Sequence, residues 1–246
     1  MEVLGIDIGG TGIKGAIVDT KKGELITERL RIPTPQPATP EAVINTVNEL
    51  VNQLSWQGPI GCGFPAAVVH DVVRTASNID KSWIGINAAE AIKKATGCHA
   101  HVINDVDAAG LAEMKFGAGK KAKGVTIMLA AGTGLGSALF INKKLVPNTE
   151  LGFVMVNKEI EAEYYAANSV REEQNLDWDI WAGRLNDFFK RLEELFYPDL
   201  FILGGGVSKK FDEYKDFFNL NTKLIPAQNK NQAGIIGAAL AARKLS

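Results

Sequence analysis

Two stretches of the chain decide its fold by repeating one pattern: Val3–Val18 reads VLGIDIGGTGIKGAIV, and Val125–Phe140 reads VTIMLAAGTGLGSALF. With an offset of 122 residues (132 minus 10), Gly10-Thr11-Gly12 falls on Gly132-Thr133-Gly134, and the apolar positions around the triplets match. Each stretch has an apolar strand, a glycine turn and a second apolar strand, which predicts a β-hairpin. Because the offset is close to half of the 246 residues, we expect two domains of related topology. A chance resemblance of two glycine-rich hairpins is the alternative.

The rest of the sequence alternates helical and strand patterns. Apolar periodicity and terminal glycine or proline residues predict helices over 41–54, 87–96, 107–116, 177–196 and 232–244, and strands over 60–64, 101–104 and 200–203. Four prolines within residues 32–40 predict an extended loop. Strands that alternate with helices, together with hairpins, predict an α/β fold with mixed sheets.

Composition excludes several classes of protein. A formal net charge of −1 gives no global attraction to nucleic acid or to a membrane surface. The apolar runs are far shorter than the ~20 residues that span a bilayer, and the N-terminus lacks the pattern of a signal peptide. Cys62 and Cys98 have no ligand spacing and are expected to be buried free thiols. We therefore expect a cytoplasmic protein with neither nucleic-acid nor membrane partners.

Three glycine clusters follow apolar strands, and they favour a ligand with several phosphates. Glycine allows the backbone to approach an anion and to direct N–H groups at it, although hairpin turns favour glycine in any case. No cluster fits the P-loop pattern, and no G-x-G-x-x-G opens a long helix, so neither a P-loop nor a dinucleotide site is expected. The predicted phosphate contacts are Gly9, Gly10, Thr11, Gly12, Lys14, Gly132, Thr133, Gly134, Gly205 and Gly206.

Asp7 interrupts an apolar strand shortly before the first glycine turn. A buried carboxylate is costly unless it binds a cation or hydrogen-bond donors. Beside a phosphate site, Asp7 is therefore a candidate ligand of Mg²⁺, directly or through water. The alternative is a carboxylate that accepts N–H bonds from the turn. Lys14, just beyond the turn, is a candidate phosphate contact or a solvated hairpin residue.

Asn104 and Asp105 follow a predicted strand, at the end of the strand where ligand sites of α/β proteins gather. An aspartate that accepts a hydroxyl proton, beside an asparagine that aligns the substrate, suits phosphoryl transfer. The alternative is a pair of residues that caps the following helix.

In this order along the chain, these motifs resemble the ROK family of sugar kinases within the actin-like ATPase superfamily, and most closely its polyphosphate-using glucokinases. The matching segments are 7–18, 103–113, 130–140, 200–210 and 231–242, and the stretches typical of the polyphosphate subgroup are 74–83 (RTASNIDKSW), 145–152 (LVPNTELG), 171–181 and 204–210 (GGGVSKK).

The resemblance implies two ribonuclease-H-like domains with a cleft between them. The expected boundaries are 1–106 for the first domain and 107–230 for the second, with a helix at 231–246 returning to the first. It implies a kinase that transfers phosphate from polyphosphate, with ATP as an additional candidate donor, to a hexose such as glucose, with Mg²⁺ and as a homodimer. Asp105 is the implied base, and the implied sugar ligands are Asn78, Asn104, Asp105, Glu150 and Glu163.

Two positions depart from the family pattern. Phe153 stands where a sugar-binding histidine is expected, and Ala66 replaces a glycine beside the sugar. His70, His99 and His101 lie elsewhere in the sequence. A degenerate sugar-binding protein and an ATP-dependent kinase for another sugar are therefore the alternatives. A DNA-binding regulator is disfavoured, because the first strand begins at residue 3.

Lysines at 120, 121, 123, 143, 144, 209 and 210 are candidates for a track that binds a long polyanion, or are simply solvated.

Overall fold

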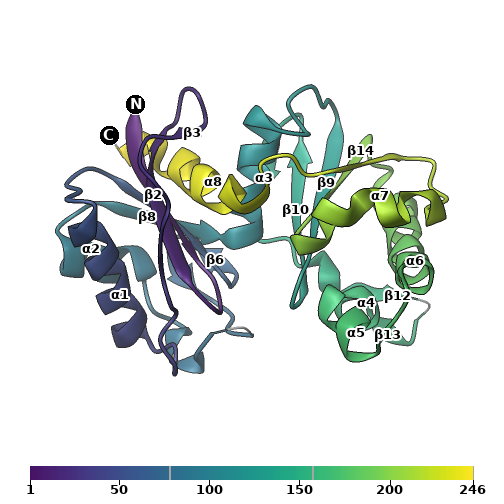
Figure 1. Cartoon of the computed structure of the whole chain (residues 1–246), viewed down its shortest axis with the longest axis horizontal. Helices are drawn as coiled ribbons and strands as arrows, with labels where there is room; N and C mark the ends of the chain where they lie inside the picture. Colours follow the sequence, from purple (N-terminus) through teal and green to yellow (C-terminus); the bar gives the residue numbers. More distant parts are fainter. Residues whose placement is uncertain (78, 157, 246) are drawn as a thin grey trace. The chain divides into compact units, whose positions relative to one another are not determined.

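The chain forms two compact units in the computed structural model, which describes residues 1–77, 79–156 and 158–245. Unit 1 comprises Met1–Ala112 and Asn231–Ser246, and unit 2 comprises Glu113–Lys230 (Figure 1). Unit 1 thus extends past the boundary at residue 106 that the sequence predicts. The reason is α3 (Asp105–Phe116), a continuous helix that contributes to both units.

Unit 1 contains a six-stranded sheet in the order β3-β2-β1-β5-β8, with β4 also paired to β2. β1 and β2 form the expected hairpin, and β5 and β8 continue the sheet in parallel. The elements are β1 (Glu2–Ile8), β2 (Ile13–Asp19), β3 (Glu24–Leu25), β4 (Leu30–Ile32), α1 (Pro40–Gln53), β5 (Ile60–Phe64), β6 (Val68–Val69), β7 (Val72–Val73), η1 (Lys81–Trp83), α2 (Ala88–Thr96), β8 (Ala100–Asn104) and α8 (Ala233–Ala241). A 3-10 helix, η6 (Ala242–Leu245), replaces the end of the helix predicted to reach residue 244.

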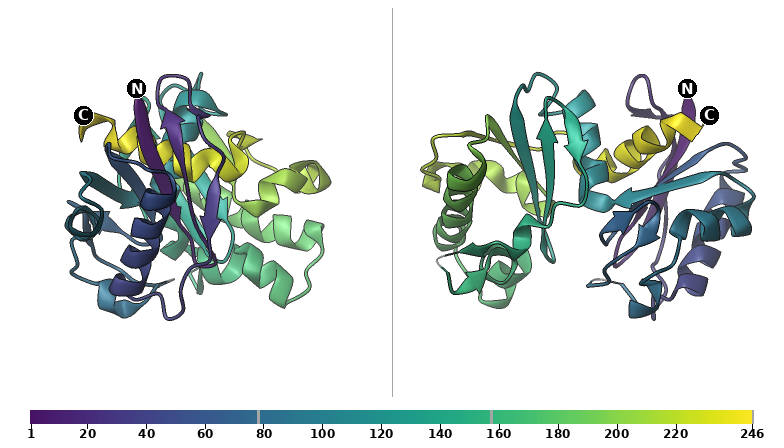
Figure 2. Two further views of the ribbon diagram at one scale, coloured as in Figure 1. Left: turned by 60° about the vertical axis from the view of Figure 1, so that its left-hand side comes forward. Right: turned by 180° about the vertical axis from the view of Figure 1, so that it is seen from behind.

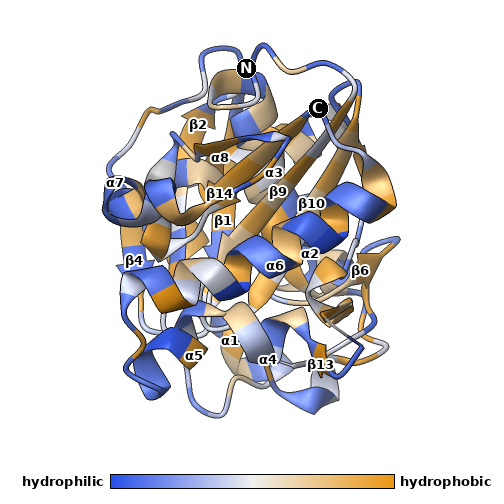
Figure 3. Ribbon diagram, turned by 90° about the vertical axis from the view of Figure 1, so that its right-hand side faces the viewer, coloured by the Kyte–Doolittle hydropathy of each residue, from blue (hydrophilic) through white to orange (hydrophobic). Residues whose placement is uncertain are grey.

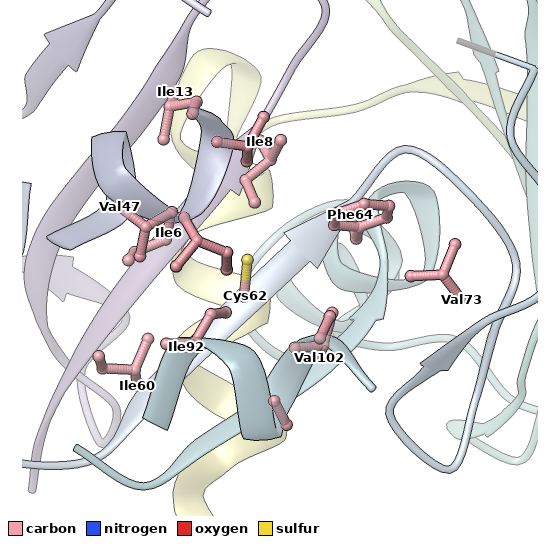
Figure 4. Packing of buried hydrophobic residues seen from close by; sticks show 14 of the residues in the cluster. Ile6, Ile8, Ile13, Val47, Ile60, Cys62, Phe64, Val73, Ile92 and Val102 are labelled. Carbon is pink, nitrogen blue, oxygen red and sulfur yellow. The ribbon is translucent and has the colours of Figure 1, made fainter. Parts of the chain in front are cut away.

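The core of unit 1 is built where α1 and α2 cover one face of this sheet. Figure 4 shows Val47 of α1 and Ile92 of α2 beside Ile6 of β1 and Cys62 of β5. Both cysteines are buried free thiols, as the sequence predicts. Burial raises the pKa of the Cys62 thiol, and the nearby Asp7 carboxylate adds to this shift.

The other face of the same sheet is covered by α8, which approaches unusually closely. A Cβ at Gly5 would overlap the carbonyl oxygen of Ile235, and a Cβ at Gly61 would overlap that of Ala238. On the helix itself, a Cβ at Gly237 would overlap the carbonyl oxygen of Ala108 in α3. These three glycines are therefore required for backbone contact between α8, the two central strands and α3.

Unit 2 repeats the strand order of unit 1, with a five-stranded sheet in the order β11-β10-β9-β14-β15. Here too a hairpin is followed by parallel strands. The elements are β9 (Val125–Ala131), β10 (Leu135–Ile141), β11 (Lys144–Val146), η2 (Leu151–Phe153), β12 (Met155–Val156), β13 (Ile160–Glu161), α4 (Ala162–Ala166), α5 (Asn168–Glu173), α6 (Trp178–Phe196), β14 (Leu200–Gly204), η3 (Gly206–Lys210), α7 (Phe211–Tyr214), η4 (Lys215–Phe217), β15 (Lys223–Pro226) and η5 (Lys230–Gln232). The repeat in the sequence is thus a repeat of topology.

The long helix α6 provides much of the core of unit 2. Its buried side chains include Trp181, Leu185, Phe188 and Leu192, which recur at helical spacing along one face. Leu195, in the last turn of the helix, is exposed. Figure 2 shows the helix from two further sides, and Figure 3 shows the contrast between its hydrophilic residues and the hydrophobic strands. Among the described residues, no helix is long and apolar enough to cross a membrane.

Candidate active site

The residues predicted for the site belong to both units, and each set is described within its own unit. In unit 1, residues Gly9–Gly12 form the turn between β1 and β2, which is called phosphate loop 1 after its predicted role. The N–H of Gly9 donates to the carbonyl of Gly12 at 3.1 Å. The side chains of Thr34 and Gln36 donate to the carbonyls of Gly9 and Gly10. The proline-rich segment thereby holds the carbonyls of the loop.

One carboxylate and two cations lie in a row across three neighbouring strands beside phosphate loop 1. Asp7 of β1 pairs with Lys14 of β2, which pairs with Arg31 of β4. The Nζ of Lys14 lies 3.3 Å from Oδ2 of Asp7, and Arg31 donates to the carbonyl of Thr11 at 2.9 Å. A Cβ at Gly12 would lie 2.6 Å from Nε of Arg31. Sequence reasoning missed Arg31, because only the pairing of β4 with β2 brings it to the loop.

Asp7 itself lies against the first turn of α8. A Cβ at Gly234 would be 3.0 Å from Cγ of Asp7, so glycine relieves a tight contact at this approach. The N-terminal end of a helix carries partial positive charge and favours a nearby anion. The Asp7 side chain is 20% exposed, so solvent or a ligand still reaches it. Asp7 is thus a charged group next to the glycine turn, shared between Lys14 and the helix end.

Asn104 ends β8, and Asp105 begins α3. Oδ1 of Asn104 accepts from the N–H groups of Val106 and Asp107 at 2.8 and 3.0 Å, so Asn104 caps the helix. Its Nδ2 donates to the carbonyl of Ala66 at 3.2 Å, and its second amide hydrogen has no acceptor among the described residues. Oδ1 of Asp105 accepts from the N–H of Val106 at 2.9 Å. The capping alternative therefore describes Asn104, while the bond from Val106 orients the carboxylate of Asp105 at the start of α3.

A cavity of about 290 Å³ opens beside phosphate loop 1 in unit 1, and its lining includes Gly9, Gly10, Gln36 and Pro65. Trp83 is fully buried and donates from its indole nitrogen to the carbonyl of Ala38 at 3.0 Å, which fixes this wall of the cavity.

Two positions near this cavity were expected to bear on sugar binding. Ser77 and Ile79 line the cavity, but Asn78, a predicted sugar ligand, lies outside the described residues. Ala66 was expected to place a methyl group near the substrate. It is instead only 6% exposed and belongs to the hydrophobic core of unit 1. The alanine in place of the family's glycine at position 66 therefore takes little space from a ligand in the cavity.

In unit 2, residues Gly132–Gly134 form the turn between β9 and β10, which is called phosphate loop 2 after its predicted role. It is one residue shorter than phosphate loop 1, since β9 ends at Ala131 and β10 begins at Leu135. Ser169 of α5 donates from its backbone N–H to Gly132 and from its hydroxyl to Thr133. Sequence reasoning missed Ser169, which supports the loop from 36 residues away.

Glu163 of α4 also supports phosphate loop 2. Its Oε2 accepts from the N–H of Leu135 at 2.9 Å, and a Cβ at Gly134 would overlap that oxygen. Glu150 is exposed as a whole, but neighbouring atoms desolvate its carboxyl. This desolvation, and then the charge of Glu163, raise the pKa of Glu150. The two predicted sugar ligands of unit 2 are therefore electrostatically coupled carboxylates.

Replacing Glu150 by Gln should stabilise the protein at neutral pH. A carboxyl whose pKa is raised in the folded state holds its proton more tightly there, so the free energy of unfolding falls as pH rises through that range. We expect E150Q to melt roughly 1–2 °C above the wild type at pH 7, because repulsion between part-exposed charges is weak. The difference should vanish at acidic pH, where the carboxyl is protonated in both states. Calorimetry across pH measures this, with exposed Glu159→Gln as the control; a less stable E150Q at pH 7 would contradict the repulsion.

The third glycine cluster follows β14. Gly205 has φ of +84°, and a Cβ there would overlap the carbonyl of Ala131, next to phosphate loop 2. Of the candidate lysines, Lys210 lies 3.7 Å from Glu213 and also 5.7 Å from the ring of Trp178, whose other cationic neighbour is Arg171. These contacts explain Lys210 without a ligand, so the polyanion track stays a prediction.

Comparison with known proteins places the chain in a family. The ROK family model matches residues 3–161 of the chain. The chain is 48% identical to a polyphosphate glucokinase of Mycobacterium tuberculosis (strain CDC 1551 / Oshkosh) over 239 residues, which cover 97% of this chain and 90% of that protein. It is 46% identical to the polyphosphate glucokinase of Mycobacterium leprae (strain TN), covering 97% of this chain and 74% of that protein.

Solved structures of sugar kinases share the fold of this chain. The crystal structure of an inorganic polyphosphate/ATP-glucomannokinase from Arthrobacter sp. strain KM matches with a TM-score of 0.94 and 46% identity, over 100% of this chain and 99% of that chain. A ROK family glucokinase from Streptomyces griseus shares the fold, with a TM-score of 0.85 at 24% identity over 99% and 100% of the two chains. The expected ribonuclease-H-like fold of the actin-like ATPase superfamily is thereby confirmed.

Proposed function

This chain belongs to the ROK family, and from that premise we propose that it is a polyphosphate–glucose phosphotransferase. The observation that carries the proposal is the 48% identity to polyphosphate glucokinases along 97% of the chain. The geometry supports it, because both units carry a glycine turn at a strand end and unit 1 adds an aspartate at the start of α3. ATP is a second donor, given the polyphosphate/ATP-glucomannokinase among the similar structures.

Asp105 is the base in this proposal. Its carboxylate accepts the proton of a sugar hydroxyl while that oxygen forms a bond to the terminal phosphorus of the donor. The bridging P–O bond breaks at the same phosphorus, and the shortened polyphosphate, or ADP, leaves with the bridging oxygen. The N–H of Val106, which also donates to Asn104, contacts Oδ1 of Asp105 and favours one orientation of this carboxylate.

The donor phosphates are held by backbone and cationic groups in this proposal. A Cβ added at position 10 or 132 would meet nothing within 4 Å, so each phosphate loop presents open backbone to a ligand. Lys14 and Arg31 add positive charge beside phosphate loop 1. Extended polyanions and nucleotide triphosphates share this requirement for N–H donors and cations.

Asp7 suits a Mg²⁺ site. Among the described residues, no group of three or more His, Cys, Asp or Glu side chains is arranged to hold a metal. Mg²⁺ needs no such cage in kinases, since one or two carboxylates, waters and the substrate phosphates hold it. Asp7, partly exposed and beside phosphate loop 1, is the carboxylate that fits, directly or through water. When bound, Mg²⁺ neutralises charge on the donor phosphates.

The sugar would be bound by polar groups that the structure leaves available. Counting only the described part of the chain, Asn104 retains one amide hydrogen, and Glu163 retains Oε1 after Oε2 accepts the N–H of Leu135. Glu150 adds a carboxyl whose raised pKa suits hydrogen bonding to a hydroxyl. Asn78, the homodimer and the cytoplasmic location stay predictions.

A coupled assay tests the proposal. Glucose and mannose are offered with polyphosphate or ATP in the presence and absence of Mg²⁺, and sugar phosphate is measured. We expect transfer from polyphosphate to glucose that stops when Mg²⁺ is chelated. Binding of glucose without transfer from either donor would instead identify a sugar-binding protein.

Phe153 should weaken glucose binding relative to a histidine at the same position. Its ring is 47% exposed, so it does not fill the core and a substitution there should be tolerated. A phenyl ring offers no hydrogen bond to a hydroxyl, and one such bond is worth about 1 to 3 kcal/mol. We expect Phe153→His to lower the KM for glucose by roughly 5- to 150-fold without a large change in kcat. Steady-state kinetics measure this, with Phe153→Leu as the control; an unchanged KM would show that another residue supplies the contact.

A further inference from the structure

Glu113 is a fully buried carboxylate that the proposed reaction does not use. It lies in the last turn of α3 and is 0% exposed. A negative charge near the C-terminal end of a helix opposes the helix dipole, and burial adds a desolvation cost. A carboxylate in this position is stable only where strong hydrogen bonds offset both the unfavourable helix dipole and the cost of desolvation.

Those hydrogen bonds come from the backbone of two segments far apart in sequence. The carboxylate accepts from the N–H of Ala118 at 2.8 Å, just after α3. It also accepts from the N–H of Gln228 at 3.0 Å and of Asn229 at 2.6 Å. A Cβ at Gly117 would overlap Oε2, so the turn is glycine where it passes the carboxylate. Glu113 therefore ties the end of α3 to the segment 228–229.

Both segments lie in unit 2, a few residues from the two places where the chain passes between the units. It leaves unit 1 between Ala112 and Glu113, and it returns between Lys230 and Asn231. The carboxylate of Glu113 thus links the segment where the chain enters unit 2 to the segment where it leaves. All of its described hydrogen bonds lie within unit 2.

Each of these connecting segments adjoins a helix that contains or contacts a residue proposed to take part in the reaction. α3 begins with Asp105, the proposed base. The segment 228–229 leads into α8, whose Gly234 lies against the carboxylate of Asp7. The two helices also touch each other directly, where Gly237 meets the carbonyl of Ala108.

We propose that Glu113 is a positioning residue for phosphoryl transfer, which fixes α3 and α8 to each other and so holds Asp105 and Asp7 in place. This inference rests on the proposed function for its catalytic consequence. Its structural part, the coupling of the two helix starts, does not depend on which reaction is catalysed.

The test compares Glu113→Gln with a matched control, Glu193→Gln. Glu193 also accepts a backbone N–H in unit 2, that of Thr222, but it lies away from both connecting segments. Gln cannot accept all of the N–H bonds that reach the two oxygens of Glu113, because one of its two polar atoms is a donor. Hydrogen–deuterium exchange and steady-state kinetics are measured on both variants and on the wild type.

We expect E113Q to accelerate exchange in the first turns of α3 and α8 and to lower kcat by about 10- to 100-fold with little change in the KM for glucose. E193Q should lose thermal stability without either effect. Faster exchange at residues 118, 228 and 229 alone, with wild-type kcat, would overturn the proposal.

If E113Q does not fold, Glu113→Asp keeps the charge but shortens the side chain, and the same two measurements decide. If the wild type transfers phosphate from neither donor, the proposed function fails. In that case, hydrogen–deuterium exchange in the first turns of α3 and α8 alone decides whether Glu113 couples the two helices.

Discussion

Replacing Asp105 by Asn should lower kcat by ~10²-fold or more while glucose binding is nearly unchanged, because an amide cannot accept the hydroxyl proton. The substitution is mild for the fold. The Asn oxygen can still accept the N–H of Val106, which the carboxylate accepts at 2.9 Å in the wild type. Loss of turnover would therefore report on proton transfer rather than on the start of α3.

Asp19→Asn is the matched control for this experiment. Asp19 also accepts a backbone N–H, that of Lys21 at 2.9 Å, but it ends β2 on the surface of unit 1. Steady-state kinetics give kcat, and calorimetry gives the affinity for glucose. Near wild-type turnover in D105N would remove Asp105 from the role of base.

The second large effect is expected at phosphate loop 2. Gly132→Val should raise the donor KM by roughly 10- to 150-fold, the effect of losing charge-assisted hydrogen bonds worth about 1.5–3 kcal/mol. A Cβ at Gly132 meets nothing within 4 Å, so a side chain there starts into open space, where it would obstruct an approaching phosphate. Gly10→Val tests the equivalent position of phosphate loop 1, which is equally open.

Gly183→Val supplies the control for the glycine variants. Gly183 lies in α6 of the same unit, and a Cβ there also meets nothing within 4 Å. Calorimetry with tripolyphosphate, a non-hydrolysable ATP analogue and glucose separates the two ligand classes. Unchanged donor affinity in G132V would show that phosphate loop 2 does not hold the donor.

Local signals in the sequence predicted much of the fold. The apolar strands around Gly10 and Gly132 are hairpins because glycine turns and strand patterning act over a few residues. Asn87 and Gly97 close the two ends of α2 for the same reason, since helix caps are read from neighbouring residues.

Long-range contacts could not be predicted in this way. Arg31 reaches phosphate loop 1 only because β4 joins β2, and Ser169 reaches phosphate loop 2 only because α5 docks on it. Glu113 appeared as an ordinary helical residue, since its partners at 228 and 229 are 115 and 116 residues away. No pattern within one element carries such information.

Side-chain partners explain the remaining differences. Lys14 has an ion pair with Asp7, Asn104 caps a helix, and the methyl group of Ala66 enters the core. Each residue type has a common structural role and a rarer functional one. The sequence alone does not choose between them, because the choice depends on which neighbours the fold brings near.

Unit 1 is built from two separate stretches of the chain, Met1–Ala112 and Asn231–Ser246, and this affects the order in which the units can be completed during synthesis. Unit 2 is a single stretch, Glu113–Lys230, and all of its strands are available once that stretch has been synthesised. Unit 1 needs α8 to cover β1 and β5, and the ribosome makes α8 only after the whole of unit 2. During translation the glycine-bearing face of the first sheet therefore lacks its covering helix until unit 2 has been synthesised, so unit 1 cannot be completed before the chain of unit 2 is made.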